Sequence, residues 1–187
     1  LTGPQAGIYA DATHAKARIT GIVPRKILSE LKKNKIVIVA GFQGLNPNDD
    51  ITTLGRGGSD LTGVALAAAL KANVCEIFTD VEGVYTTDPR IEPAAKKIDR
   101  ISHDAMLELA SSGAQVMQSR SIELAKKYNI TIHVRSTFSE NTGTLIVKEV
   151  KEMEEPVVSG IAYDRNLAKL SITNVPDKPV IAALIFT

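Results

Sequence analysis

The sequence Leu-Gly-Arg-Gly-Gly-Ser-Asp at residues 54–60 leads into an alanine-rich, helix-forming segment that ends at Leu70. Its three glycines let backbone N–H groups turn toward a ligand without a clash from a Cβ atom, and the positive end of the helix dipole points into the loop. We therefore expect a phosphate or a carboxylate to bind here. The alternative is a surface turn capped by Ser59 or Asp60. A Walker A loop and a Gly-x-Gly-x-x-Gly loop are both excluded by the residue order.

The segments around this loop alternate between strand and helix patterns. Strands are expected at 17–23, 36–40, 74–79 and 130–134, and helices at 24–34, 60–70, 102–111 and 114–128, with a polar turn at 46–50 and a long loop from 80 to 100. The run at 36–40 is apolar and β-branched throughout, which is typical of a strand covered on both faces. The pattern predicts an α/β three-layer sandwich with a mostly parallel central sheet.

The composition narrows the class of protein. The chain has 187 residues, of which 44% are hydrophobic, and its 22 Lys and Arg residues balance 21 Asp and Glu residues, so nothing favours a nucleic-acid partner. No apolar run reaches the roughly 18 residues of a membrane helix, and no signal peptide is present, so no membrane partner is expected. The single Cys75 is expected to be a buried, reduced thiol, which favours the cytoplasm. The three histidines lie far apart, so no metal held by the protein is expected.

A second chemical segment follows the strand expected at 74–79. Asp80 stands at the carboxyl edge, where open α/β sheets bind ligands, and could accept a hydrogen bond from a ribose hydroxyl or form an Asx turn. Further on, Pro89 keeps the backbone extended ahead of Arg90. Arg90 would suit a bidentate phosphate clamp, or a surface ion pair with Asp88 or Glu92.

Taken in order, these segments closely resemble aspartate kinases. The resemblance rests on residues 39–44, 52–60 and 76–90, and it continues through 2–8, 106–110, 134–136 and 143–145. It implies the amino-acid kinase fold. It also implies transfer of the γ-phosphoryl group of MgATP to the side-chain carboxylate of L-aspartate, giving 4-phospho-L-aspartate, the first step of lysine, threonine and methionine biosynthesis. Mg²⁺ would enter with ATP.

The resemblance also implies which residues form the site. Those expected to bind aspartate are Arg56, Gly57, Gly58 and Ser59, with Ser59 and Asp60 as catalytic residues. Those expected to bind ATP are Thr79, Asp80, Tyr85, Arg90, Gln115 and Val116. Asp60 would orient a catalytic lysine or a metal-bound water, Arg90 would face the phosphates, and Tyr85 would face the nucleoside.

The sequence departs from the family's pattern at two lysines. The family carries an N-terminal Lys-Phe/Tyr-Gly-Gly motif whose lysine reaches the phosphates, and this sequence starts after it, so the chain by itself is expected to be inactive. Gln115 stands where the family has a second phosphate lysine. Since glutamine brings no charge, transfer is expected to slow by about one to two decades.

The composition changes after the apolar residues 144–146. We expect a catalytic domain at 1–147, a charged linker at 148–156, and the truncated beginning of an ACT-like α+β regulatory domain at 157–187. Such domains in this family bind lysine or threonine between paired units, which predicts a homo-oligomer with Asp177, Lys178 and Pro179 at the effector site. Val180 replaces the glycine of the effector loop, so we expect insensitivity to both amino acids.

Two alternatives stay open. Other amino-acid kinases, acting on glutamate, acetylglutamate, carbamate or UMP, share the fold. The missing lysines also allow a catalytically silent nucleotide-binding or regulatory subunit.

Overall fold

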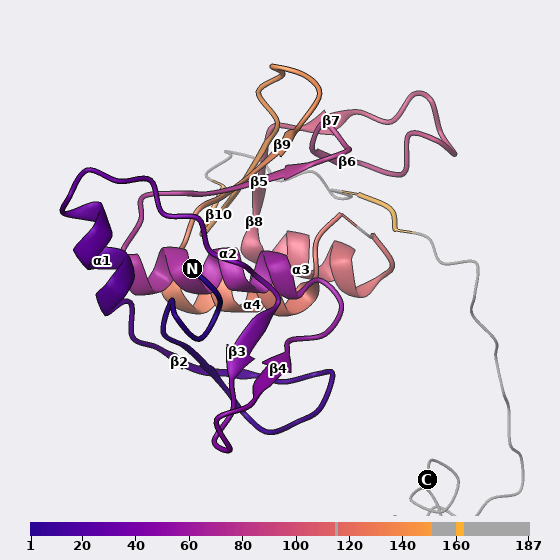
Figure 1. Ribbon diagram of the computed structural model, residues 1–187. Coiled ribbons are helices and arrows are strands. Elements are labelled where there is room, and N and C mark those ends of the chain that lie inside the picture. The colour runs from indigo at the N-terminus through magenta and orange to yellow at the C-terminus, as the bar shows by residue number, and fades with distance from the viewer. Residues whose placement is uncertain (115, 151–159, 163–187) are drawn as a thin grey trace, which may run out of the picture.

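The structure is a computed structural model that describes residues 1–114, 116–150 and 160–162 (Figure 1). Its strands are β1 Ile8–Ala10, β2 Ile19–Ile22, β3 Gln43–Leu45, β4 Ile51–Thr53, β5 Cys75–Thr79, β6 Val84–Tyr85, β7 Lys97–Ile98, β8 Arg100–Ser102, β9 Ile132–Ser136 and β10 Thr144–Val147. Its helices are α1 Arg25–Leu31, α2 Gly58–Leu70, α3 His103–Ser111 and α4 Ser119–Tyr128. Helices and strands are interspersed along the chain, which confirms the α/β class. No helix of the described part is long and apolar enough to cross a membrane.

The strands form two four-stranded sheets and a small third sheet. The first sheet has the order β2-β1-β3-β4, the second has the order β5-β9-β10-β8, and β6 pairs with β7. Parallel pairs join β1 to β3, β5 to β9 and β10 to β8, whereas β1–β2, β3–β4, β9–β10 and β6–β7 are antiparallel. The prediction of one mostly parallel central sheet is therefore wrong for the described residues. Chain neighbours joined by short loops pair antiparallel, and apolar patterning alone does not reveal this.

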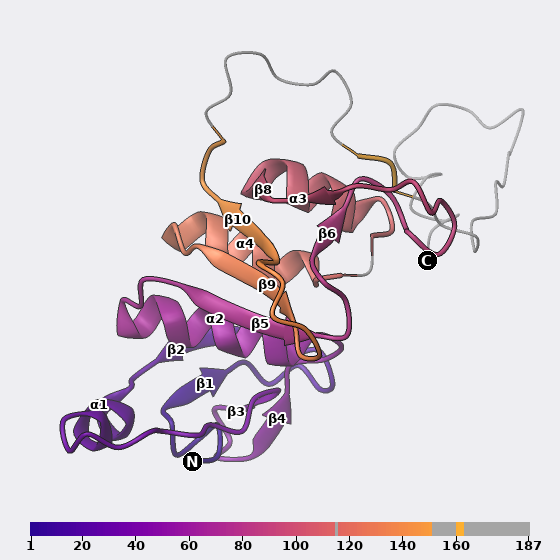
Figure 2. The same ribbon diagram turned by 90° about the horizontal axis from the view of Figure 1, so that it is seen from above.

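Helix α2 lies between the two large sheets (Figures 1 and 2). Between Asp60 and its end at Leu70 it carries no charged residue. Val64 packs into the core of the second sheet, while Leu61 packs with residues of the first sheet and its loops and Leu70 packs against a third cluster around β1 and α1. A helix that is apolar on all sides is stable only when it is covered all round, so the sequence of α2 determines its central place.

The largest core lies under the second sheet. It joins Met106 of α3 and Ile122 of α4 to Ile132, Val134 and Ile146 of β9 and β10. Helices α2, α4 and α3 lie side by side along this sheet (Figure 1). The core thereby fixes the starts of α2 and α4 relative to each other.

Residues 36–40 form no strand, so that prediction is wrong. Ile36 and Ile38 are 94% and 80% exposed, whereas Val37 and Val39 pack against the core around β1 and α1. The Ala40 N–H donates to the Leu1 carbonyl over 2.8 Å, so this segment runs beside the first residue. A strand that is buried on both faces needs packing partners on both faces. The described residues supply packing partners on one face only.

The helix predicted at 114–128 is shorter than expected. The N–H of Ala114 closes the end of α3 on the Leu109 carbonyl, Gly113 has a φ of +112°, and α4 begins only at Ser119. Gln118 is extended at the N-cap, with φ −75° and ψ 133°. The segment between α3 and α4 is therefore a connection that reaches the loop before α2.

Most other elements are confirmed with shifted ends. The strands expected at 17–23, 74–79 and 130–134 correspond to β2, β5 and β9, and the helices expected at 24–34, 60–70 and 102–111 correspond to α1, α2 and α3. The turn at 46–50 joins β3 to β4, with the Asn46 N–H donating to the Asp50 carbonyl over 2.9 Å. The loop expected from 80 to 100 contains the short strands β6 and β7, and β8 begins at its end. The sequence analysis missed these strands, as well as β1, β3, β4 and β10.

The predicted linker at 148–156 and the predicted ACT-like piece at 157–187 lie almost wholly outside the described residues. Only residues 148–150 and 160–162 of them are described, and none of these belongs to a helix or strand. The domain boundaries thus stay predictions.

Candidate functional site

The glycine loop before α2 follows a path that other residues cannot take without strain. Gly55 and Gly57 have φ angles of +81° and +69°, in the left-handed region. Gly58 has a different constraint, because a Cβ atom there would lie 2.9 Å from both the Leu54 Cβ and the Phe42 Cδ2. All three glycines are therefore needed for the shape of this loop.

The N-terminus of α2 is open to a ligand. Gly57 is the N-cap residue, and no side chain in the described part of the chain caps the helix. The side chains of Arg56 and Ser59 are exposed beside it. The structure thus gathers the residues predicted to bind aspartate, namely Arg56, Gly57, Gly58 and Ser59, at one uncapped helix terminus, where amide groups and the helix dipole favour an anion.

Asp60 lies in the first turn of α2 and is turned inward. Burial raises the pKa of its carboxyl group, and a hydrogen bond from the backbone N–H of Gln118 opposes that rise. Burial and the negative charge of Asp60 raise the pKa of the buried Cys75 thiol to about 11. Cys75 therefore lies near Asp60. The prediction that Cys75 is buried and forms no internal disulfide is confirmed, and its reduced state stays a prediction.

Gln118 joins the start of α4 to the glycine loop. Its Nε2 donates to the Arg56 carbonyl over 2.5 Å, and its side chain packs directly against Gly57. With the bond from its backbone to Asp60, one residue contacts three positions of the predicted aspartate site. Sequence reasoning missed Gln118, because the helix expected from 114 placed it within a helix instead of at an N-cap. An amide side chain before a helix start gives no distinctive sequence signal.

The segment at 39–44 also reaches the start of α2. Phe42 has a φ of +70°, its N–H donates to the Thr62 Oγ1 over 3.1 Å, and that hydroxyl donates to the Gly58 carbonyl over 2.7 Å. The Leu54 N–H in turn donates to the Phe42 carbonyl over 3.0 Å. Two of the segments that carry the resemblance therefore form one hydrogen-bonded unit.

The predicted ATP residues after β5 are placed on the edge of the second sheet. Thr79 ends β5, and its hydroxyl donates to the Asp80 carboxylate over 3.0 Å. Because β5 returns along α2, its carboxyl end and the start of α2 lie at the same end of the two elements (Figure 2). Both chemical segments thus open toward one end of the molecule.

Arg90 forms the ion pair that the sequence left as an alternative. Its Nε and Nη2 donate to the two carboxylate oxygens of Asp88 over 3.0 and 2.8 Å, and its side chain is 88% exposed. This pair, followed by the charge of Asp80, raises the pKa of the guanidinium. Arg90 and Asp80 are therefore neighbours, and the fork of Arg90 is occupied by a carboxylate.

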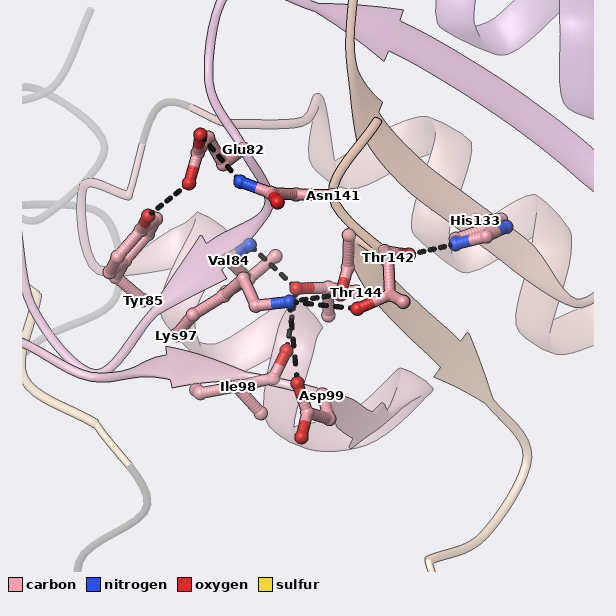
Figure 3. A network of polar contacts seen from close by, with 11 residues as sticks. Glu82, Val84, Tyr85, Lys97, Ile98, Asp99, His133, Asn141, Thr142 and Thr144 are labelled. Carbon is pink, nitrogen blue, oxygen red and sulfur yellow. Dashed lines mark hydrogen bonds and ion pairs between the residues drawn. The ribbon is translucent and has the colours of Figure 1, made fainter. Parts of the chain in front are cut away.

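Tyr85 belongs to a polar network that links β6 to the loop after β9 (Figure 3). Its hydroxyl donates to one oxygen of Glu82 over 3.4 Å, while the Asn141 amide donates to the other over 2.8 Å. Burial, with Glu82 as a further cause, raises the pKa of Tyr85. Glu82 and Asn141 were not predicted, since neither their type nor their spacing distinguishes them in the sequence.

Lys97 of β7 contacts the loop after β9 from the opposite side of this network (Figure 3). Its ammonium donates to the Thr142 hydroxyl over 3.2 Å and to the Gly143 carbonyl over 3.0 Å, and it pairs with Asp99 over 3.3 Å. Lys97 is also the register partner of Tyr85 across β6 and β7. This lysine was not predicted as part of the site.

The remaining predicted site residues are placed differently. Val116 is half-buried against the main core. Gln115 and the proposed effector residues Asp177, Lys178 and Pro179 lie outside the described residues. Among the described residues, no group of three His, Cys, Asp or Glu side chains could hold a metal ion.

Known proteins resemble both the sequence and the structure. A model of the Amino acid kinase family matches residues 2–136. The aspartate kinase of Pseudomonas putida is 54% identical over 182 residues, which cover 97% of this chain and 44% of that protein. Two crystal structures of Escherichia coli aspartokinase III are also similar, one in complex with aspartate and ADP (TM-score 0.74) and one with lysine and aspartate (TM-score 0.71). Each of the two structures is 33% identical to this chain in sequence, and the match covers 81% of this chain and 35% of the Escherichia coli chain.

This chain therefore spans less than half the length of these relatives. The similarity confirms the resemblance to aspartate kinases that the sequence motifs indicate. The family match itself includes the glycine loop, Thr79 and Tyr85. The chain belongs to the amino acid kinase family.

Proposed function

We propose that the protein transfers the γ-phosphoryl group of ATP to the side-chain carboxylate of L-aspartate. The observation that carries this proposal is the glycine loop at the uncapped start of α2 with Arg56 beside it, in a chain 54% identical to an aspartate kinase over 182 residues. A helix N-terminus next to a guanidinium suits a substrate that brings carboxylates and receives a phosphoryl group.

The reaction needs positioning and charge neutralisation more than covalent help from the protein. A carboxylate oxygen of aspartate forms a bond to the γ-phosphorus, the bond from that phosphorus to the β,γ-bridging oxygen breaks, and ADP leaves with the electron pair. Arg56, the exposed Ser59 hydroxyl and the Gly57 amide would hold aspartate for this attack, while Gly58, whose N–H donates to the Gly55 carbonyl over 2.9 Å, shapes the loop beside them. Their positive partial charges would also stabilise charge on the transferred group.

Asp60 would act beside the reacting atoms. It is anchored by the backbone N–H of Gln118, which favours its ionised form against the effect of burial. An ionised carboxylate at this place would orient a cationic side chain or a water bound to Mg²⁺. The Mg²⁺ ion would arrive with ATP as part of that substrate.

The nucleotide would lie toward the end of β5. Thr79 and Asp80 would face the ribose, Tyr85 the nucleoside and Arg90 the phosphates, with Gln115 and Val116 completing the site. For this role Arg90 must exchange the carboxylate of Asp88 for a phosphate, which presents the same kind of acceptor oxygens to the guanidinium fork.

Further parts of the proposal concern the protein's surroundings. The buried thiol of Cys75 supports a reducing compartment, for which the cytoplasm is proposed. A homo-oligomer formed through ACT-like units, and lysine or threonine as effectors at Asp177, Lys178 and Pro179, are proposed from the sequence alone. Titration of both amino acids against the full-length gene product tests the expected insensitivity that follows from Val180.

Hydroxamate trapping of the acyl phosphate tests the reaction. The assay combines MgATP and L-aspartate with the full-length gene product, its Gln115→Lys variant, and the 187-residue chain. We expect signal from the full-length product, a signal about ten- to a hundredfold higher from the variant, and none from the short chain.

The outcomes separate the alternatives. Signal with glutamate, acetylglutamate or carbamate in place of aspartate would assign another acceptor. Nucleotide binding without signal from either full-length form would identify a silent regulatory subunit and contradict the proposed activity.

A further inference from the structure

An open cleft of about 680 Å³ lies between the first sheet and α4, beside the glycine loop. Lys16 and Arg18, which lead into β2, line one side, and Arg120 and Lys127 of α4 line the other. Apolar side chains, including Leu54 and Leu124, complete the lining. The Thr79 edge and the Tyr85 network do not contribute to it, so this cleft is separate from the proposed nucleotide site. It adjoins the proposed aspartate site, because Gly55 and Arg56 of the glycine loop line it, and Lys16, Arg18, Arg120 and Lys127 are its cations outside that site.

The charge around this cleft is strongly one-sided. Five cationic side chains line it, those of Lys16, Arg18, Arg56, Arg120 and Lys127, against the single acidic side chain of Glu123. None of the five forms an ion pair with a carboxylate of the described residues. Like charges gathered around a concave surface raise the local concentration of anions.

Hydrogen bonds from Arg120 hold the elements around the cleft together. Its Nη1 donates to the Leu54 carbonyl and its Nη2 to the Ala17 carbonyl, each over 2.9 Å. The guanidinium therefore ties the start of β2 and the end of β4 to α4. Carbonyl groups satisfy its hydrogen bonds but leave its positive charge without a counter-ion.

We propose that this cleft binds a small organic phosphate. The cationic walls would hold the phosphate group, and the apolar lining would hold the rest of the molecule. The volume lies in the range of about 300–1,000 Å³ that is usual for small-molecule sites. Arginine and lysine together suit a phosphate dianion, since arginine offers a planar fork and lysine a point charge.

Phenyl phosphate is a suitable probe, because it combines a dianion with one apolar ring. Its affinity for the full-length gene product is measured by calorimetry with ADP and aspartate in excess, which fill the proposed substrate sites. Hydrogen–deuterium exchange then locates it. We expect protection of residues 16–19 and 119–127, and affinity that falls as the salt concentration rises.

Two double variants test the assignment. Lys16→Gln with Lys127→Gln should weaken binding about tenfold, since two charge-assisted contacts are lost at an exposed site. Lys33→Gln with Lys35→Gln is the matched control. These two exposed lysines follow α1 and form ion pairs with Glu30, so the double variant should leave the affinity unchanged.

The proposal would be overturned by no binding of phenyl phosphate, by equal affinity in both double variants, or by protection confined to residues 79–90. Phenol should not bind, and equal binding of phenol would show a merely apolar site. None of these readouts requires turnover, so the proposal about the cleft can fail or hold independently of the kinase activity.

Discussion

Gly57 and Gln118 are in direct contact: a Cβ atom built on Gly57 would lie 2.7 Å from the Cβ of Gln118. The contact joins the first residues of α2 to the first residues of α4. The hydrogen bond from the Gln118 side-chain amide to the Arg56 carbonyl reinforces this contact. The shape of the glycine loop thus depends on α4, which is far from it in the sequence.

Gly57→Ala should destabilise the protein by about 1–3 kcal/mol, because the left-handed φ and the close approach of Gln118 both oppose a side chain. Urea denaturation measures the loss. Gly21→Ala is the control, since a Cβ atom there meets nothing within 4 Å. Equal stability of the two variants would contradict the argued role of the contact.

Arg56→Ala should raise the KM for aspartate about 10- to 100-fold, the effect of losing a charge-assisted contact to a carboxylate. The KM for ATP should change little, because the predicted nucleotide residues lie around the end of β5. Steady-state kinetics of the full-length gene product with each substrate varied in turn makes the comparison. Arg25→Ala, an exposed arginine on α1, serves as the control. Unchanged aspartate kinetics would remove Arg56 from the site.

The elements that the sequence predicts well are those whose own residues require burial. Helix α2 carries no charged residue after Asp60 and is mostly apolar, and it was predicted to within two residues of its start. The run at 36–40 has an equally apolar sequence, yet Ile36 and Ile38 are exposed. Apolar residues show that a cover is needed, but they do not show whether the described part of the chain provides it.

The site shows the same limit. The glycines at 55, 57 and 58 are predictable, because glycine has a distinctive backbone chemistry. Gln118 and Lys97 are ordinary polar residues whose importance comes only from contacts across 62 and 46 positions of sequence. Such contacts arise from the packing of α4 and from the pairing of β6 with β7, and local sequence does not encode them.

Lys97→Met should release the loop that contains Thr142 and Gly143. The variant loses two hydrogen bonds and an ion pair at a side chain that is 22% exposed, so we expect a cost of about 1–2 kcal/mol. Limited proteolysis should cleave residues 137–143 faster, and the KM for ATP should rise a few-fold, because Tyr85 pairs with Lys97. Lys96→Met, at the exposed neighbouring lysine, should match the unchanged protein in both measurements. If it behaves like Lys97→Met, the effect comes from general charge and not from this network.

His103 should make stability depend on pH in the acid range. The side chain is 1% exposed, and its Nε2 donates to the Ile130 carbonyl over 3.0 Å, which leaves Nδ1 buried without a partner among the described residues. Burial is the main cause that lowers its pKa in the folded state. The unfolded chain therefore takes up the proton first, at about pH 6.5, and the free energy of unfolding should fall as the pH drops from there toward the lower folded value. One proton gives a slope of at most about 1.4 kcal/mol per pH unit. Urea denaturation from pH 7.5 to 5 should show a smaller fall for His103→Gln, whereas His14→Gln, at an exposed side chain, should keep the original slope. An unchanged slope in His103→Gln would mean that another group carries the dependence.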